Sequence, residues 1–219
     1  MKERNTSIYG ICAEGIPYVA FCALCSVVFA LLSWGMAAVF FVILTFFVMN
    51  FFRDPQRIAP QEKGVVLSPA DGRVVKIGPA VDPFTGEKRQ RISVFMNVFN
   101  VHVNRAPVAS EVVEIRYIKG RFLNASLDKA SADNERNLIL LRDDEGNAFT
   151  VVQIAGLIAR RIVCWVEKGE RLLQGERLGL IKFGSRVDLY LPEGYEVDIR
   201  MGEKVLAGLD VIARKSQKE

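Results

Sequence analysis

The sequence predicts a mainly β fold, a sandwich or barrel hybrid, preceded by an α-helical hairpin in a membrane. Three observations lead to this prediction. An uncharged, apolar segment runs from Gly15 to Phe52. The remainder consists of short runs in which apolar residues alternate, separated by Gly, Pro, Asn and Asp. Finally, a short pattern that begins at Val166 recurs at Ile199.

The composition limits the classes of protein to which this chain can belong. With 219 residues, half of them hydrophobic, the chain has enough material for one domain and a further segment. The net charge of +4 is mild and its charges are mixed, so we expect no nucleic-acid partner. Four Cys show neither a disulfide framework nor metal-ligand spacing, and His102 is the single histidine. A reducing, cytoplasmic setting without a metal site fits best.

The apolar N-terminal segment is nearly twice the length of roughly 20 residues that one membrane crossing needs. Ser33-Trp34-Gly35 interrupts it near the middle. We therefore predict two short helices, about residues 16–32 and 36–52, which form a membrane hairpin. Each is slightly short for a full crossing, so a re-entrant hairpin and one long tilted helix stay open.

Basic residues flank this hairpin on both sides. Lys2 and Arg4 precede it, and Arg53, Arg57 and Lys63 follow it. Positive charge marks the cytoplasmic side of a membrane segment, so we expect both ends of the hairpin in the cytoplasm.

The chain is expected to have three parts. Residues 1–52 are the anchor, residues 53–63 are a basic linker stiffened by Pro55 and Pro60, and residues 64–219 are the main domain. The strands predicted first in this domain are residues 65–67, 73–77, 91–96, 111–118, 138–141 and 149–154. Residues 143–147 join the last two as a hairpin, and residues 124–137 form a loop or a short helix.

The internal repeat pairs residues 166–175 with residues 199–208. Each copy has an apolar residue, a Gly turn, an apolar pair and a second Gly, which predicts a strand, a tight reversal and another strand. Two such copies suggest a pseudo-symmetric sandwich, like the hybrid barrels that carry lipoyl or biotinyl groups. This fold analogy implies no function by itself.

Between the two copies, two strand-like runs meet at Gly184 and Ser185. A Gly-Ser bond in a sheet is most often a bulge or a bend. The sharper hypothesis is that the Ser185 hydroxyl attacks the exposed Gly184 carbonyl and the chain cuts itself.

Two further residues could take part in such chemistry. Asp71 before Gly72 is first of all a turn residue. His102 lies among apolar neighbours, where a structural histidine is common. Together with Ser185, however, they supply a carboxylate, an imidazole and a hydroxyl, which are the groups used to activate a serine.

At this point five motifs, in order from about Phe51 to Pro192, resemble the short form of the phosphatidylserine decarboxylase family. They are Phe52-Arg53-Asp54-Pro55, Ser68-Pro69-Ala70-Asp71-Gly72, Asn100-Val101-His102-Val103-Asn104-Arg105-Ala106-Pro107, Asn134-Glu135-Arg136-Asn137 and Phe183-Gly184-Ser185-Arg186-Val187-Asp188.

This resemblance implies a proenzyme that cleaves itself between Gly184 and Ser185. The products would be a β chain of residues 1–184 and an α chain of residues 185–219, which stay together as a heterodimer. Ser185 would become a pyruvoyl group that forms a Schiff base with the substrate amine, without pyridoxal phosphate or metal. Asp71 and His102 would be the candidate bases.

The resemblance is incomplete at one position. Longer family members carry a His-x-x-His-x-Pro pattern, in which His102 matches the first His and Arg105 stands in place of the second. Whether His102 serves self-cleavage, decarboxylation or both stays open.

The implied substrate is phosphatidylserine, a lipid that remains in the bilayer. An anchor would hold the enzyme at the cytoplasmic face of the inner membrane, where Arg53 and Arg57 favour anionic headgroups. Acyl preference and higher oligomers are left open. The polar residues expected to line the headgroup site are Asn124, Ser126, Lys129, Asn134 and Arg136.

Two alternatives remain at this stage. One is a non-enzymatic, membrane-anchored lipoyl-like or adaptor module, although the sequence lacks both a long heptad hairpin and a modifiable Lys between the repeats. The other keeps the chemistry but acts on the ether lipid archaetidylserine.

Overall fold

The computed structural model describes residues 7–8, 10–60, 62–121, 133–156, 161–182 and 184–216. It divides into two compact units, Met1–Gln56 and Arg57–Glu219.

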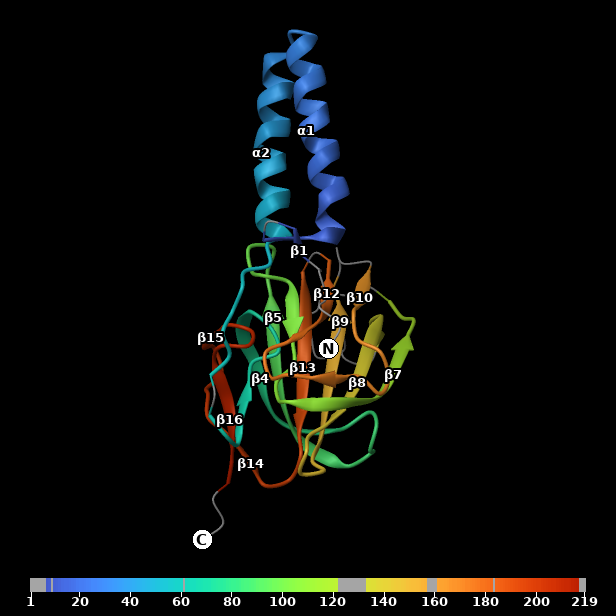
Figure 1. Ribbon diagram of the computed structural model, residues 1–219, viewed down its shortest axis with the longest axis vertical. Coiled ribbons are helices and arrows are strands. Elements are labelled where there is room, and N and C mark those ends of the chain that lie inside the picture. The colour runs from blue at the N-terminus through green and yellow to red at the C-terminus, as the bar shows by residue number, and fades with distance from the viewer. Residues whose placement is uncertain are drawn as a thin grey trace. The chain divides into compact units, whose positions relative to one another are not determined.

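Two antiparallel helices, α1 (Ile16–Leu31) and α2 (Gly35–Phe51), make up most of the first unit (Figure 1). Their bounds agree with the predicted helices to within one residue, because the break at Ser33 separates two runs without any charge. Phe29 of α1 stacks on Phe41 of α2, with ring centroids 5.3 Å apart. The short elements before them are β1 (Ser7–Ile8), β2 (Ile11–Cys12) and the 3₁₀ helix η1 (Ala13–Gly15).

The helical pair presents apolar side chains outward. Phe21 is 63% exposed, Leu31 80% and Met36 91%, and such a surface is matched by lipid rather than by water. Among the described residues, Ala13–Leu31 is the stretch long and apolar enough to cross a membrane, and α2 is somewhat shorter. This N-terminal segment indicates membrane association.

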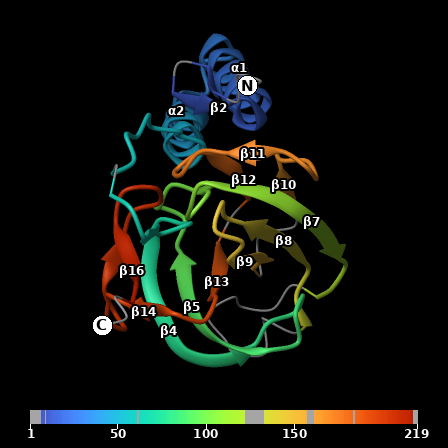
Figure 2. The ribbon, with the colours of Figure 1, turned by 60° about the horizontal axis from the view of Figure 1, so that its bottom comes forward.

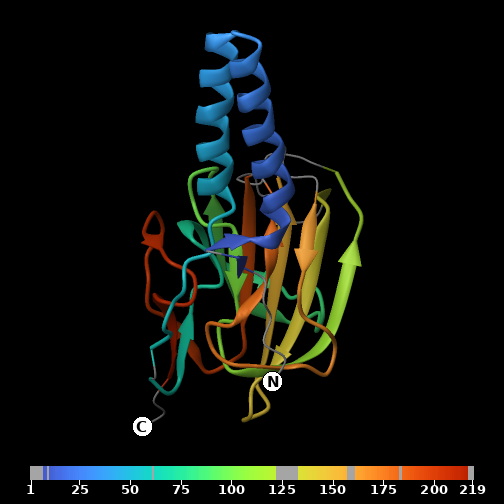
Figure 3. The same ribbon diagram turned by 45° about the horizontal axis from the view of Figure 1, so that its top comes forward.

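The second unit is built from strands, as predicted. One sheet has eight strands in the order β11-β7-β8-β9-β13-β5-β4-β15, and two three-stranded sheets have the orders β10-β12-β6 and β14-β16-β3. The large sheet curls strongly, so that β4 and β7 lie on opposite sides of the view in Figure 2. Figure 3 shows the yellow strands β8 and β9 beside the lime strand β7.

The strands of the large sheet are β4 (Gly72–Val81), β5 (Lys88–Met96), β7 (Ser110–Ile118), β8 (Arg136–Arg142), β9 (Ala148–Ala155), β11 (Arg171–Leu172), β13 (Ser185–Leu191) and β15 (Lys204–Val205). Those of the small sheets are β3 (Val65–Leu67), β6 (Val103–Arg105), β10 (Ile162–Cys164), β12 (Arg177–Ile181), β14 (Tyr195–Val197) and β16 (Val211–Lys215).

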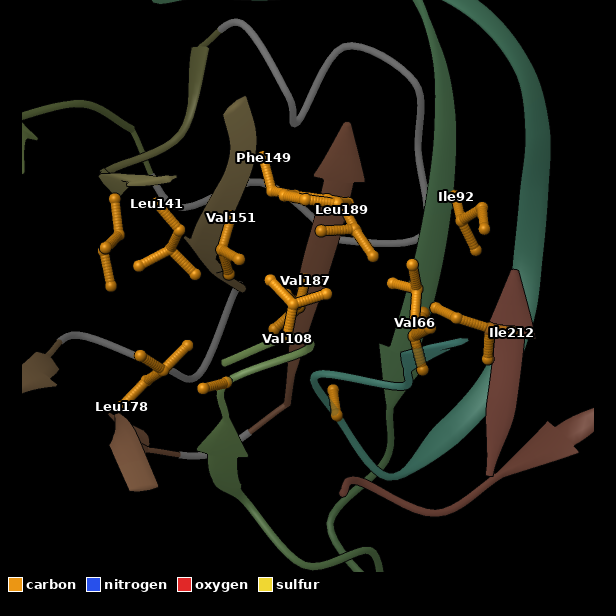
Figure 4. Packing of buried hydrophobic residues seen from close by; sticks show 14 of the residues in the cluster. Val66, Ile92, Val108, Leu141, Phe149, Val151, Leu178, Val187, Leu189 and Ile212 are labelled. Atoms are coloured by element: carbon orange, nitrogen blue, oxygen red, sulfur yellow. The ribbon is translucent and has the colours of Figure 1, made fainter. Parts of the chain in front are cut away.

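The hydrophobic core lies between the large sheet and the small ones (Figure 4). Val187 and Leu189 of β13 point into it, as the alternation along this strand predicts. Leu178 of β12 and Ile212 of β16 pack against the same cluster from the small sheets. Each of these four side chains is fully buried, so β13 is held by its packing as well as by its hydrogen bonds.

The two copies of the repeat occupy equivalent positions. Gly169 N–H donates to Val112 O over 2.7 Å, and Gly202 N–H donates to Val74 O over 2.8 Å. The strands that follow, β11 and β15, are the two edges of the large sheet. A Cβ built on Gly208 would lie 3.3 Å from Cα of Gly175, so the closing turns of the two copies touch. The two copies are therefore placed equivalently in the fold, and the turns that follow the two edge strands meet at Gly175 and Gly208.

Candidate active site

Ser185 is the first residue of β13, the strand between β5 and β9 (Figure 2). It is paired with Met96 on one side and with Ala155 on the other. Its side chain is fully buried and shares the core-facing side of the strand with Val187 and Leu189. The hydroxyl therefore sits at the end of the core and not on the surface.

Gly184 precedes this strand with φ of +63°. A Cβ at this position would meet nothing within 4 Å, so space does not require a glycine here. The left-handed backbone conformation does require a glycine, because a residue with a side chain costs about 1 kcal/mol in that conformation. The bond between Gly184 and Ser185 thus joins a turn conformation to a fully paired strand.

The core becomes polar around Ser185. Ser185 Oγ lies 3.9 Å from the sulfur of Met96, and Asn104 Nδ2 lies 3.7 Å from that same sulfur. Gln153 Nε2 donates to Asn104 Oδ1 over 2.8 Å, and Asn137 Nδ2 donates to Gln153 Oε1 over 2.9 Å. These contacts join β6, β8 and β9 to the first residue of β13.

His102 is fully buried just before β6. Its Nδ1 lies 2.9 Å from Asn100 O. A carbonyl oxygen can only accept, so Nδ1 carries the proton and Nε2 is the basic nitrogen of the neutral ring. Ile181 N–H donates to His102 O over 3.4 Å, which extends the ladder between β12 and β6 to this residue. His102 and Asn104 therefore project to the same side of the chain.

Asp71 stands one residue before β4. Because β5 separates β4 from β13, its backbone lies about 10 Å from that of Ser185 at the same end of the sheet. Its carboxylate accepts from Arg57 Nη1 at 2.5 Å, from Arg57 Nη2 at 2.9 Å and from Ala207 N–H at 2.8 Å. Among the described residues, no hydrogen bond joins Asp71 to His102. The two candidate bases thus lie at one end of the sheet, each with hydrogen-bond partners of its own.

A second cluster of charge lies on the opposite face of β13. Arg186 Nε and Nη2 donate to the two oxygens of Asp188 over 2.7 and 2.8 Å, and both residues are buried. Arg91, Arg136, Asp188 and Tyr190 line a cavity of about 270 Å³ on this face. Burial and the charge of Asp188 raise the pKa of Tyr190, so its hydroxyl stays protonated there.

The predicted headgroup residues are only partly described. Asn124, Ser126 and Lys129 lie outside the described residues. Asn134 Nδ2 donates to Ala155 O over 2.7 Å, which fastens the end of β9 beside Ser185. Arg136 donates to Asn134 O over 3.1 Å and reaches the cavity on the outer face of the sheet.

Comparison with known proteins identifies the family. The family model for phosphatidylserine decarboxylase matches residues 44–213. The chain is 58% identical over 209 residues to the phosphatidylserine decarboxylase proenzyme of Solidesulfovibrio magneticus, covering 95% of this chain and 98% of that one. The chain belongs to the phosphatidylserine decarboxylase family. The proenzymes of Nitratidesulfovibrio vulgaris, 54% identical with 97% and 98% covered, and Burkholderia mallei, 48% identical with 93% and 94% covered, agree.

Membership of this family confirms the resemblance and makes the chain an enzyme, a carboxy-lyase that acts on phosphatidylserine. The non-enzymatic adaptor is thereby excluded. The structure adds Met96 and Gln153, which the sequence did not single out and which contact the predicted site residues or their neighbours. Arg57, which was expected to favour anionic headgroups, is instead bound to Asp71 in a buried ion pair. Gln153 did leave one signal, since it is an amide on the face of β9 whose other members, Phe149, Val151 and Ala155, are apolar and in the core.

Proposed function

We propose that this chain is a proenzyme that cuts itself between Gly184 and Ser185, and that residue 185 then carries a pyruvoyl group used to decarboxylate phosphatidylserine. The observation that supports this most directly is the placement of Ser185. It is a fully buried serine at the first position of the central strand, directly after a glycine in the left-handed conformation.

The residues around position 185 fit such a group. Its side chain faces Met96, whose sulfur also accepts from the amide of Asn104, and neither of these side chains is charged, which suits a methyl ketone. The rest of β13 is paired along both sides, up to Leu191 with β5 and up to Tyr190 with β9. When formed, the pyruvoyl ketone supplies an acceptor for the substrate amine and for the electrons released with carbon dioxide.

The two candidate bases, His102 and Asp71, have different roles in our proposal. His102 offers Nε2 as the basic nitrogen, because Asn100 O holds the proton on Nδ1. Asp71 is held by Arg57 and Ala207, so it contributes a fixed negative charge at the same end of the sheet. In our proposal His102 moves the proton. Asp71 supplies its negative charge from the start of β4, with β5 between it and Ser185.

The lipid would approach this end of the sheet from a membrane surface. The apolar helices α1 and α2 keep the enzyme on the bilayer, and basic residues at both ends of that segment favour the cytoplasmic face. We propose Asn124, Ser126, Lys129, Asn134 and Arg136 as headgroup contacts. Of these, Arg136 supplies a guanidinium, the side chain suited to a phosphodiester.

The test is an intact-mass measurement of the detergent-extracted protein. We expect wild type to give two polypeptides, residues 1–184 and a piece that begins at residue 185 without a free amine. Ser185→Ala lacks the attacking hydroxyl, so we expect one full-length, inactive chain.

Ser93→Ala is a matched control, because Ser93 is also a fully buried serine, on the neighbouring strand β5. It should be cut like wild type. Cleavage of Ser185→Ala, or an uncut wild type that decarboxylates phosphatidylserine, would refute the proposal.

Pairing of β13 also predicts that the two pieces stay together. Two ladders and the buried Val187, Leu189 and Leu191 would hold the α chain in place after the cut. We therefore propose a heterodimer of the β and α chains as the active form.

A further inference from the structure

Three buried amide side chains form a line that ends beside Ser185. Asn137 on β8, Gln153 on β9 and Asn104 on β6 are connected by hydrogen bonds of 2.9 and 2.8 Å. Asn104 and Gln153 are fully buried, and Asn137 is 1% exposed. Burying an amide without a hydrogen-bond partner costs free energy of folding, so these two hydrogen bonds stabilise the three side chains in the core.

The direction of the amides follows from the atom at the end of the line. The thioether sulfur of Met96 has no proton, so it can only accept. Asn104 therefore turns its NH₂ group toward the sulfur of Met96, and its Oδ1 accepts from Gln153. Gln153 in turn accepts from Asn137 through Oε1. Each bond fixes the next, and the line delivers an N–H donor to the sulfur of Met96, which Ser185 Oγ approaches to 3.9 Å.

The backbone leaves Gln153 little freedom to turn away. A Cβ built on Gly179 of β12 would lie 3.1 Å from Gln153 Nε2 and 2.2 Å from Val163 O. Only a glycine allows β12 to pass this close to both groups. The middle member of the line is thus enclosed by a neighbouring strand.

We propose that Asn104 donates a hydrogen bond to Oγ of Ser185 during self-cleavage, and that Gln153 and Asn137 are positioning residues that fix the direction of its amide. This inference rests on the proposed function, since it concerns the chemistry of the cut between Gly184 and Ser185.

Negative charge develops on this oxygen when the chain separates. Attack by Oγ on the Gly184 carbonyl carbon gives an ester, with the former amide nitrogen left on residue 185 as an amine. A base then removes the α proton of residue 185, a Cα–Cβ double bond forms and the Cβ–Oγ bond breaks. The electron pair of that bond stays on Oγ, which leaves as part of the Gly184 carboxylate. A fixed donor at Oγ stabilises this leaving group.

The first variant is Asn104→Asp, which keeps the shape and replaces the donor by an acceptor. Loss of one such donor typically slows a step by about 10²–10³-fold, so we expect conversion of the proenzyme to slow by that factor. The ester should accumulate before elimination. Hydroxylamine attacks an ester carbonyl, so it should release a fragment that begins with Ser185 and has a free amine, whereas the normal product has none.

The second variant leaves Asn104 untouched. Gln153→Glu places an acceptor opposite Asn104 Oδ1, so the Asn104 amide should rotate and present its oxygen to Ser185. We expect conversion to slow at least about tenfold, with the same hydroxylamine-sensitive ester. A purely structural defect would lower the melting temperature without making that ester.

Thr150→Val is the matched control, because Thr150 lies on β9 with Gln153 but on the other face of the sheet. Its buried hydroxyl has no hydrogen-bond partner among the described residues, so this variant should mature like wild type. Rapid conversion of both Asn104→Asp and Gln153→Glu, or slow conversion without a hydroxylamine-sensitive ester, would overturn the inference. If Ser185→Ala stays uncut in the same experiment, the proposed function survives that result.

Discussion

Arg57 and Asp71 form a buried ion pair, with side chains that are 7% and 4% exposed. Removing one partner of such a pair leaves an uncompensated charge in the protein interior, which costs about 3–5 kcal/mol. For Arg57→Gln we therefore expect the melting temperature in detergent to fall by roughly 10 °C.

Arg57→Lys is the control for this prediction. It keeps the positive charge but cannot make both bonds to the carboxylate, so its melting temperature should lie between those of wild type and Arg57→Gln. Equal melting temperatures for wild type and Arg57→Gln would show that the pair adds nothing to stability.

At the scale of residues, the sequence identified candidates for the site but few of the residues around them. Gly184, Ser185 and His102 were proposed because each is unusual in its local pattern, and the structure describes Ser185 and His102 as fully buried. Arg57 was interpreted as a basic linker residue that favours anionic headgroups, and its partner Asp71 as a turn residue with a second, catalytic interpretation. Nothing local shows that Arg57 reaches Asp71, because the contact depends on how the chain folds back on itself.

Two glycines of β4 allow a clean comparison at the scale of elements. Gly72 and Gly78 have similar φ values, +155° and +157°, so alanine meets the same backbone strain at both. A Cβ on Gly72 would lie 2.1 Å from Phe95 O, whereas a Cβ on Gly78 would meet nothing within 4 Å. We expect Gly72→Ala to be less stable than Gly78→Ala by about 2 kcal/mol or more.

Melting temperatures of the two alanine variants, measured side by side in detergent, test this expectation. The difference between the two melting temperatures isolates the clash between β4 and β5, since both variants have the same backbone strain. If the two variants melted together, the close approach of the strands at Gly72 would not be a constraint.

Helices and strands could be predicted where a pattern within a short stretch of the sequence marks them. The helices followed from an uncharged run, β7 followed from alternation, and β8 and β9 followed from two apolar runs on either side of the polar turn at residues 143–147. β6 (Val103–Arg105) was missed because it is short and two of its three residues are polar, although all three are buried. Asn104 is bonded to Gln153 of β9 and Arg105 to Gly175 in the turn after β11, and only the folded chain brings these partners near.

The whole molecule combines an apolar helical segment with a β unit whose substrate is a lipid. Large exposed apolar side chains on α1 and α2 predict attachment that does not depend on charge. After cell lysis, we expect the protein to remain with the membrane fraction in high salt and in alkaline carbonate, and to be released by detergent.

A peripheral protein bound through its basic residues would behave differently, because salt screens such contacts. Release by high salt alone would contradict this prediction. An unrelated peripheral protein in the same extract, washed off by salt, serves as the control.

If the chain is cut before Ser185 as proposed, the position of β13 determines how the α chain can leave the molecule. An edge strand can peel away by itself, but β13 has a neighbour along each side. Withdrawing it would open both halves of the curled sheet at once. The backbone amide hydrogens of β13 should therefore exchange only through global opening, and escape of the proposed α chain should coincide with the loss of the entire fold.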